Sequence, residues 1–409
     1  MTGLRARLTS SVACAATLAV LAAGPARAQS MDWASDDTLT EQIAATLDEA
    51  PLDSDTAPEE GDLSFPQVLI DDDIAPDEPI GEIRGGLVYD ETLGTGALFG
   101  LRHRDPFRAG IPLEFTAKVA QKGNAAELKL FKDGMAGPGS RGFLTFRYRD
   151  RDPFDTYETS DGQLDLGLGR VWERPDGQLS GRLGLRYRDS AVDDVPLFSS
   201  SFITEDDRQT LSLAGRIAYT GGSGPMAWQA GLTGEIGQRT GDSSESYSRA
   251  VAHARMRYRI GQPAWVTFGV KAGQVSGDDL LVSERFLGGE QVMRGFEYGG
   301  IGPRDTSAIN DDALGGESFA GASLQVDTTL ARFGIPNWTV GAFVDWGSVW
   351  GLSGGPAGVD DDYYLRSAGG ISVGWQLDNL RLQVDISEPI QERDEDISEA
   401  LRLTLTARF

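Results

Sequence analysis

The sequence has little of what most enzymes and metal proteins depend on. Among 409 residues there are one cysteine and two histidines. Cys14 is the single cysteine, which excludes a disulfide framework and a thiolate metal site. His103 and His253 belong to no Ser/His/acid arrangement at matching strand ends. We therefore expect no enzymatic activity, no catalytic residues, no metal site and no cofactor.

Long apolar runs are also missing beyond the first thirty residues. No later stretch approaches the roughly 20 apolar residues that a transmembrane helix needs. Only helices and closed β-barrels satisfy every backbone polar group in lipid, so a membrane form of this chain would have to be a barrel. The net charge of −25 opposes binding to nucleic acid.

The first 28 residues carry an export signal. Arg5 and Arg7 form a short basic start, residues 11–23 are apolar, and Ala26-Arg27-Ala28 supplies a small-x-small cleavage pattern. We predict that residues 1–28 are a secretory signal peptide, because the apolar run is too short to span a bilayer.

Positive charge is absent from residues 31–80, which contain sixteen Asp and Glu and no Lys or Arg. So much charge with so little apolar surface does not build a core. We predict that residues 29–80 are a mostly disordered periplasmic leader. A Thr38-x-x-Glu41 capping box predicts one short helix within it, over 39–49.

From residue 81 onward, apolar and polar residues alternate. In 143–149 the apolar Leu144, Phe146 and Tyr148 alternate with polar residues that include Arg147. Such segments run to about ten residues, the length of a tilted membrane strand. We predict an all-β fold, a transmembrane antiparallel β-barrel of about sixteen strands over 81–409. The expected strand starts are 83, 95, 111, 125, 141, 163, 178, 209, 225, 248, 264, 316, 337, 364, 379 and 401.

The expected connections indicate an orientation. An even strand count puts both termini on one side, the periplasm. The long connections are predicted at 151–162, 190–208, 239–247, 276–315, 351–363 and 388–400. The second to the sixth of them follow strands 7, 9, 11, 13 and 15, the odd-numbered positions expected for outward loops. The last strand carries Leu401, Leu403, Leu405, Ala407 and Phe409 on one face. A final strand of this kind, ending in Phe, is typical of bacterial outer-membrane barrels, and we expect the assembly machinery to bind it.

The longest connection, 276–315, contains FLGGEQVMRGFEYGGIGPRD over 286–305. This segment resembles the inward-folded sixth extracellular loop of the outer membrane protein 85 superfamily, in its assembly-factor branch of BamA/TamA or bacterial surface antigen type. The downstream segments 313–330, 341–350, 365–375 and 401–409 also resemble that branch. The loop motif is carried by Met293, Arg294, Gly295 and Phe296, and its flanks by Gly288, Gly289, Gly302, Pro303, Arg304 and Asp305.

An arginine on a loop folded into a barrel needs acidic or polar partners, because a buried unpaired charge is costly. The resemblance implies acidic partners on the inner wall of strands 12 and 13. Asp345 matches the strand-13 position and should share the lumen face with Phe343. Gln325 replaces the family's strand-12 acid, and Asp327 is offered as its substitute.

The resemblance implies a barrel in the outer membrane of a Gram-negative bacterium, in contact with lipids and lipopolysaccharide. It would assist insertion of outer-membrane proteins or translocation of polypeptides, through a weak seam between the first and last strands. The leader is too short for a periplasmic polypeptide-transport-associated (POTRA) domain, which weakens a multi-subunit assembly role. The alternatives are a two-partner-secretion transporter of one polypeptide and a passive pore. The anionic leader is also expected to dock against arginines of the inner wall or to remain solvated.

Overall fold

The computed structural model describes residues 81–90, 94–154, 157–196, 199–240, 245–261, 264–289, 292–308, 311–353, 358–377 and 380–408. The predicted signal peptide, the leader with its helix at 39–49, and Phe409 lie outside these ranges. Within them, no helix has the length and apolar character that crossing a membrane requires.

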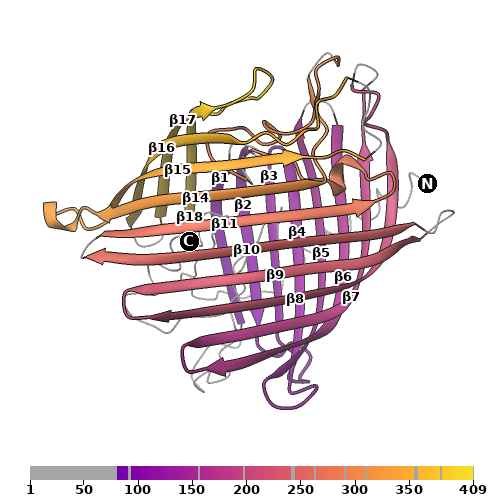
Figure 1. The fold of residues 1–409 in the computed structure, drawn as a ribbon. Helices are drawn as coiled ribbons and strands as arrows, with labels where there is room; N and C mark the ends of the chain where they lie inside the picture. Colours follow the sequence, from indigo (N-terminus) through magenta and orange to yellow (C-terminus); the bar gives the residue numbers. More distant parts are fainter. Residues whose placement is uncertain are drawn as a thin grey trace.

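Sixteen of the described strands close into a single antiparallel barrel (Figure 1). Each strand pairs with its neighbours in the chain, and the first strand pairs with the last. The strands are β1 Gly81–Asp90, β2 Gly94–His103, β3 Leu113–Ala120, β4 Gly123–Asp133, β5 Ser140–Phe154, β6 Tyr157–Arg174, β7 Gly177–Asp193, β8 Asp206–Ser223, β9 Met226–Thr240, β10 Ser246–Gly261, β11 Ala264–Gly277, β14 Ser318–Thr329, β15 Trp338–Trp350, β16 Arg366–Leu377, β17 Leu380–Gln391 and β18 Leu401–Arg408.

The long connection between β11 and β14 has structure of its own. It contains the 3-10 turn η2, Val282–Glu284, and a two-stranded sheet of β12, Arg304–Asp305, and β13, Asp312–Ala313. A second 3-10 turn, η3, Ala331–Phe333, lies between β14 and β15.

The predicted all-β barrel is confirmed, and most predicted strand starts fall within three residues of the observed ones. The prediction of a long loop at 151–162 is wrong. β5 continues to Phe154 and β6 begins at Tyr157, so most of that segment is strand. Asp and Pro suggested a loop there. The pairing of β5 with β6 shifts register between Arg151 and Phe154. Pro153 lies within this irregularity, one of the few places where a strand tolerates proline.

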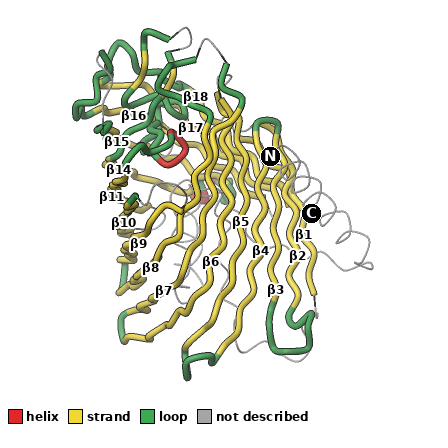
Figure 2. The backbone as a smooth tube through the Cα atoms, turned by 90° about the vertical axis from the view of Figure 1, so that its right-hand side faces the viewer, coloured by secondary structure: helices red, strands yellow, loops and turns green. Residues whose placement is uncertain are grey.

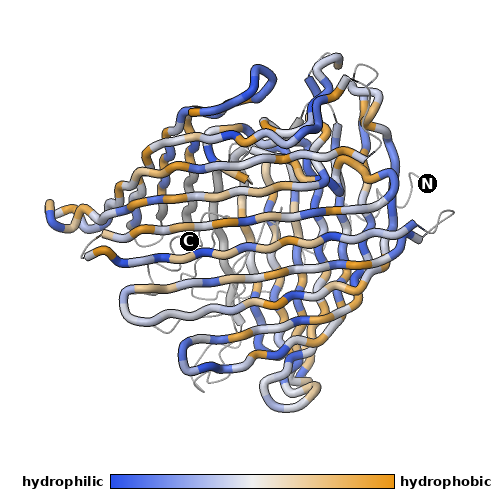
Figure 3. Tube along the Cα trace, in the orientation of Figure 1, coloured by the Kyte–Doolittle hydropathy of each residue, from blue (hydrophilic) through white to orange (hydrophobic). Residues whose placement is uncertain are grey.

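The outer face of the barrel wall is apolar and the inner face is polar, as a lipid environment requires. Outward-facing side chains are apolar and exposed; Leu183 and Leu185 on β7 are each 57% exposed. Inward-facing side chains are polar and buried, such as Arg186 between Leu185 and Tyr187. This alternation is visible along the strands in Figure 3. A soluble fold would bury the leucines, so the pattern is that of a barrel with lipid outside and a polar lumen.

The barrel wall is of unequal height. β6 and β8 each have 18 residues, whereas β3 and β18 each have 8. A membrane strand needs only about 9–11 residues, so the long strands rise beyond the lipid at the end that carries the long connections. Those loops gather at the upper end of the barrel in Figure 2, and tight turns lie at the opposite end. Gly81 at the start of β1 and Arg408 at the end of β18 lie at the end of the barrel opposite the long connections.

Candidate functional site: the inward loop and the barrel seam

The connection between β11 and β14, here called the inward loop (residues 278–317), packs against the lumen wall. Met293 and Phe296 of the predicted motif are 3% and 0% exposed. They join an apolar cluster with Phe286 of the same loop and with Phe319 and Val349 of the wall. Burying these side chains inside a polar lumen removes apolar surface from water and fixes the loop there.

Arg294 lies at the centre of a polar cluster on β14 and β15. Its Nε donates to Asp345 Oδ2 at 2.8 Å and its NH2 group to Asp345 Oδ1 at 3.0 Å, a two-pronged ion pair. The NH2 group also donates to Ser323 Oγ at 3.2 Å, and the NH1 group donates to Gln325 Oε1 at 2.8 Å. The guanidinium carbon lies 3.4 Å from the centre of the Phe343 ring, so a cation–π contact adds to the hydrogen bonds.

Gln325 connects the guanidinium of Arg294 to Asp327. The amide nitrogen of Gln325 donates to Asp327 Oδ1 at 2.7 Å while its oxygen accepts from Arg294. An amide can join a cation to an anion in this way because it carries both an acceptor and a donor. Asp327 therefore joins the Arg294 cluster through Gln325.

Glycines make room for the motif where the loop meets the wall. Gly295 has φ +91°, and a Cβ there would lie 2.6 Å from the Cβ of Ala368 on β16. Gly321 and Gly347 are register partners on β14 and β15, and a Cβ on either would lie 2.7 Å from an atom of Val292. Gly295 is predicted by the motif, whereas Gly321 is not, because a lone glycine in a strand carries no pattern.

The motif flanks turn the loop back on itself. Gly289 and Gly302 have φ +94° and +113°, which favours glycine at both positions. Gly299 N donates to the carbonyl of Gly288 at 2.6 Å, and Leu314 N to that of Pro303 at 3.0 Å. The Arg304 guanidinium donates to the carbonyls of Gly299, at 2.6 Å, and Asp311. Burial lowers the pKa of Arg304, although nearby acids such as Asp311 oppose that shift.

An extracellular loop covers the inward loop from outside. Ser200, in the connection between β7 and β8, donates from Oγ to Asp305 Oδ2 at 2.6 Å and from its backbone N to Asp312 Oδ2 at 2.5 Å. Burial raises the pKa of Asp305, but hydrogen bonds from Ser200 and Ser307 outweigh it and hold the pKa below the usual value. Tyr157, Ile203 and Leu314 belong to an apolar cluster beside these contacts.

A second attachment joins the motif to the strand that ends the barrel. The connection between β17 and β18, residues 392–400, forms main-chain hydrogen bonds with the loop. Glu297 N donates to Ile397 O at 3.1 Å, Ile397 N to Gly300 O at 2.9 Å, and Glu399 N to Gly295 O at 3.1 Å. The loop is thus held on one side by Asp345 and on the other by residues directly preceding β18.

The seam between β1 and β18 is the shortest pairing in the barrel. It joins residues 86–89 to 405–408, only four register pairs, whereas β1 forms ten with β2 and β6 forms seventeen with β7. Within the described residues, 81–85 of β1 have no partner on β18, and 401–404 of β18 have none on β1. Leu401, Leu403 and Leu405 of the predicted terminal strand pair with β17.

Comparison with known proteins gives the class. An Omp85 superfamily domain matches residues 93–409. A stretch of 151 residues is 30% identical to the outer membrane protein assembly factor BamA of Neorickettsia risticii (strain Illinois), covering 36% of this chain and 20% of that protein.

Solved structures share the fold. The structure of BamA from Haemophilus ducreyi lacking POTRA domains 1–3 aligns with a TM-score of 0.68 at 17% identity, over 81% of this chain and 71% of that one. CdiB from Escherichia coli aligns with a TM-score of 0.58 at 14% identity, over 82% of this chain and 64% of that one.

The fold and site define an outer-membrane β-barrel built around an inward loop. The chain belongs to the Omp85 superfamily. Its place is the outer membrane of a Gram-negative bacterium.

Proposed function

We propose that this barrel assists the insertion of outer-membrane proteins by opening laterally between β1 and β18. The observation that carries the proposal is the seam, whose four register pairs are the fewest between any two neighbouring barrel strands. Separating four pairs costs far less than separating the seventeen of β6 and β7. An opened seam would expose strand edges, and an exposed edge is a template for another strand.

The unpaired part of β1 gives the incoming strand a starting point. Residues 81–85 pair with β2 on one side and extend past the end of β18 on the other. They lie at the periplasmic end, where an unfolded client arrives. Within the described residues, 81–85 have no partner on β18. Backbone N–H and C=O groups left unpaired in lipid cost energy, so strand addition at this edge is favourable.

The inward loop links the lumen to the seam. Arg294 is bonded to Asp345 on β15, while Gly295 and Gly300 are bonded to residues 397–399 just before β18. A brace between β15 and the start of β18 would keep that side of the barrel rigid while the β1 side moves. The mechanism uses no covalent chemistry and no cofactor. Its proposed partners are an unfolded barrel client, the outer-membrane assembly machinery, membrane lipids and lipopolysaccharide.

Two other transport functions make different demands on the lumen. A passive pore needs an open channel, but the inward loop buries Met293 and Phe296 inside the barrel. A two-partner-secretion transporter passes a polypeptide through the lumen, and the CdiB structures have the same fold. The Gly302-Pro303-Arg304-Asp305 extension, typical of the assembly-factor branch, favours insertion.

A disulfide across the seam tests the proposal. Val88→Cys and Thr406→Cys place cysteines at register partners of β1 and β18. The matched control, Leu185→Cys with Leu213→Cys, places them at register partners of β7 and β8. Insertion of a newly made barrel protein is then followed in proteoliposomes with and without reductant.

We expect the oxidised seam pair to stop insertion, reductant to restore it, and the control pair to have no effect. Full insertion through the oxidised seam would overturn the proposal. The two-partner-secretion function replaces the proposal if two results hold together. The reduced protein does not support insertion, and the oxidised seam variant still exports a secreted polypeptide.

A further inference from the structure

The lumen contains an arginine-lined cavity that the inward loop and the seam do not explain. Its walls come from β5, β6, β7, β9 and β10, and the inward loop closes one side with Arg285, Phe286 and Tyr298. Seven arginines line it, against two acidic residues, Asp161 and Glu235. The arginines are Arg147, Arg149, Arg151, Arg186, Arg188, Arg249 and Arg285.

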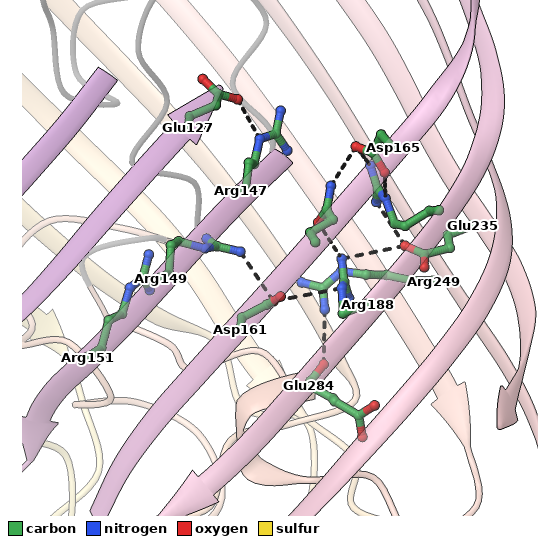
Figure 4. A network of polar contacts seen from close by, with 12 residues as sticks. Glu127, Arg147, Arg149, Arg151, Asp161, Asp165, Arg188, Glu235, Arg249 and Glu284 are labelled. Carbon is green, nitrogen blue, oxygen red and sulfur yellow. Dashed lines mark hydrogen bonds and ion pairs between the residues drawn. The ribbon is translucent and has the colours of Figure 1, made fainter. Parts of the chain in front are cut away.

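The two carboxylates are shared among several of these cations. Asp161 lies 3.5 Å from Arg149 and 3.7 Å from Arg188. Glu235 lies 2.9 Å from Arg186 and 3.6 Å from Arg188. Figure 4 shows these side chains converging from neighbouring strands onto one region of the lumen.

Other arginines of the cavity contact neutral oxygens. Arg249 donates to the carbonyl of Glu284 at 3.0 Å and Arg285 to that of Leu314 at 3.2 Å. Arg151 donates to the hydroxyl of Tyr298 at 3.5 Å. Burial lowers the pKa of Arg285, with Glu317 and Glu284 acting against the shift, so this guanidinium lies in a poorly hydrated place. Two of the seven, Arg147 and Arg186, also pair with Glu127 and Asp165, which lie outside the lining, at 2.6 Å and 2.7 Å. Among the lining residues the cations still outnumber the acids. An excess of desolvated cations is costly and favours entry of anions.

We infer that the cavity binds the acidic leader of the same chain, residues 31–80. The leader has sixteen carboxylate side chains and no Lys or Arg, the opposite of the cavity lining. It joins the barrel at Gly81, at the periplasmic end of β1. The segment from Ser54 to Gly81 can extend up to roughly 90 Å, whereas the longest strands are about 60 Å long, so the middle of the leader is long enough to reach the cavity.

The interaction is electrostatic and therefore has a characteristic salt dependence. Several carboxylates facing several guanidiniums form charge-assisted hydrogen bonds in a confined space. Tethering gives the leader a high effective concentration, so cavity occupation needs no great intrinsic affinity. Raising the salt to about 1 M shortens the screening length to roughly 3 Å and should release a segment held mainly by charge.

A pair of introduced cysteines in the full chain measures occupation directly. Ser54→Cys lies in the leader and Ser160→Cys lines the cavity. The control pair keeps Ser54→Cys and moves the second cysteine to Leu185, which faces outward at 57% exposure. Cys14, in the predicted signal peptide, is replaced by alanine. Oxidation in detergent or lipid is followed by proteolysis and mass analysis.

We expect the leader–cavity pair to cross-link within one molecule at low salt, at least tenfold more than the control pair, and to lose most of that yield at about 1 M salt. Arg149→Gln with Arg151→Gln should lower the yield severalfold. Arg170→Gln with Arg174→Gln, which removes two exposed arginines of β6, should leave it unchanged.

The proposal is overturned if the cavity and control pairs cross-link equally. It is also overturned if neither raised salt nor substitution of the cavity arginines changes the cross-link yield. Cross-links that form only between two different molecules would overturn it too and would assign the cavity to an acidic segment of another polypeptide. A shift in electrophoretic mobility on heating reports whether each variant is folded. None of these readouts involves client insertion, so they are independent of the proposed function.

Discussion

At the scale of single residues, the Arg294 cluster shows how one charge is kept inside a barrel. Its partners span two strands, and Phe343 stacks beneath the guanidinium while its ring edge covers Gly370. Asp345 also accepts from the backbone N of Arg294 at 3.1 Å, so it fixes the loop backbone together with the side chain. Loss of Asp345 should therefore affect the position of the loop as well as the charge balance.

A double-mutant cycle on Arg294 and Asp345 should reveal strong coupling. Arg294→Ala or Asp345→Ala alone leaves a buried charge without its main partner, which costs about 3–5 kcal/mol. The double variant should lose less than the sum by about 1–3 kcal/mol. Urea unfolding in lipid measures these free energies. Arg294→Lys, which keeps the charge but not the planar fork, should fall between wild type and Arg294→Ala. Additive losses would contradict the ion pair.

Gly295 and Gly334 offer a matched comparison of two left-handed glycines. Both have positive φ, +91° and +80°, but a Cβ at Gly295 meets Ala368 at 2.6 Å, whereas at Gly334 nothing lies within 4 Å. Gly334→Ala should cost about 1 kcal/mol from backbone strain alone. Gly295→Ala should cost about 1–3 kcal/mol more, because the neighbouring strand must move. The unfolding midpoint of each variant tests this; equal losses would show that space at Gly295 is not limiting.

At the scale of elements, the inward loop is held from three sides. Arg294 joins it to β14 and β15, residues 397–399 join it to β18, and Arg239 donates to Glu284 Oε2 at 2.8 Å from β9. These anchors come from distant parts of the chain. A change at any one of them should loosen the loop locally before it unfolds the barrel, because each anchor involves few residues.

Proline substitutions in the connection between β17 and β18 separate this anchor from general loop stability. Ile397→Pro removes the N–H that donates to Gly300. It should raise hydrogen exchange at Glu297 and Glu399 at least tenfold and increase protease cutting of the inward loop. Asp394→Pro is the control, since Asp394 occupies the second position of the turn that Asp396 N closes on Arg393 O, where proline is tolerated. Equal hydrogen-exchange rates at Glu297 and Glu399 in the two variants would show that residues 397–399 do not anchor the inward loop specifically.

The sequence was a better guide to the wall than to the loops. Strand positions follow from side-chain alternation, which lipid outside and water inside impose on every strand. Arg294, Asp345 and Gln325 could be placed together because the motif and the strand faces were both readable. The hydrogen bonds of Ser200 to Asp305 and of Ile397 to Gly300 were not predicted, because contacts between loops far apart in the chain leave no periodic pattern. The strand extension over 151–162 was missed for a related reason: above the lipid both faces are polar, so alternation fades while pairing continues.

At the scale of the whole molecule, charge is divided between its parts. The net charge is −25, and residues 31–80 alone contribute sixteen negative charges. Arginines are gathered on the inner wall between acidic residues, as in the pairs Arg147–Glu127 and Arg186–Asp165. Arg147 and Arg186 also line the arginine-lined cavity, where cations outnumber acids among the lining residues even though some of the arginines have acidic partners.

The stagger of the seam also sets the chain direction of any strand that is added to β1. β1 runs from the periplasm toward the cell surface, and every neighbour in the barrel runs opposite to the strand beside it. A guest that docks on 81–85 in the same antiparallel sense must point its carboxyl end back to the periplasm, as β18 does. Under the proposed insertion function, residues 81–85 of β1 would select client strands by their direction before any side chain makes contact. They would then favour the last strand of a client barrel over its first.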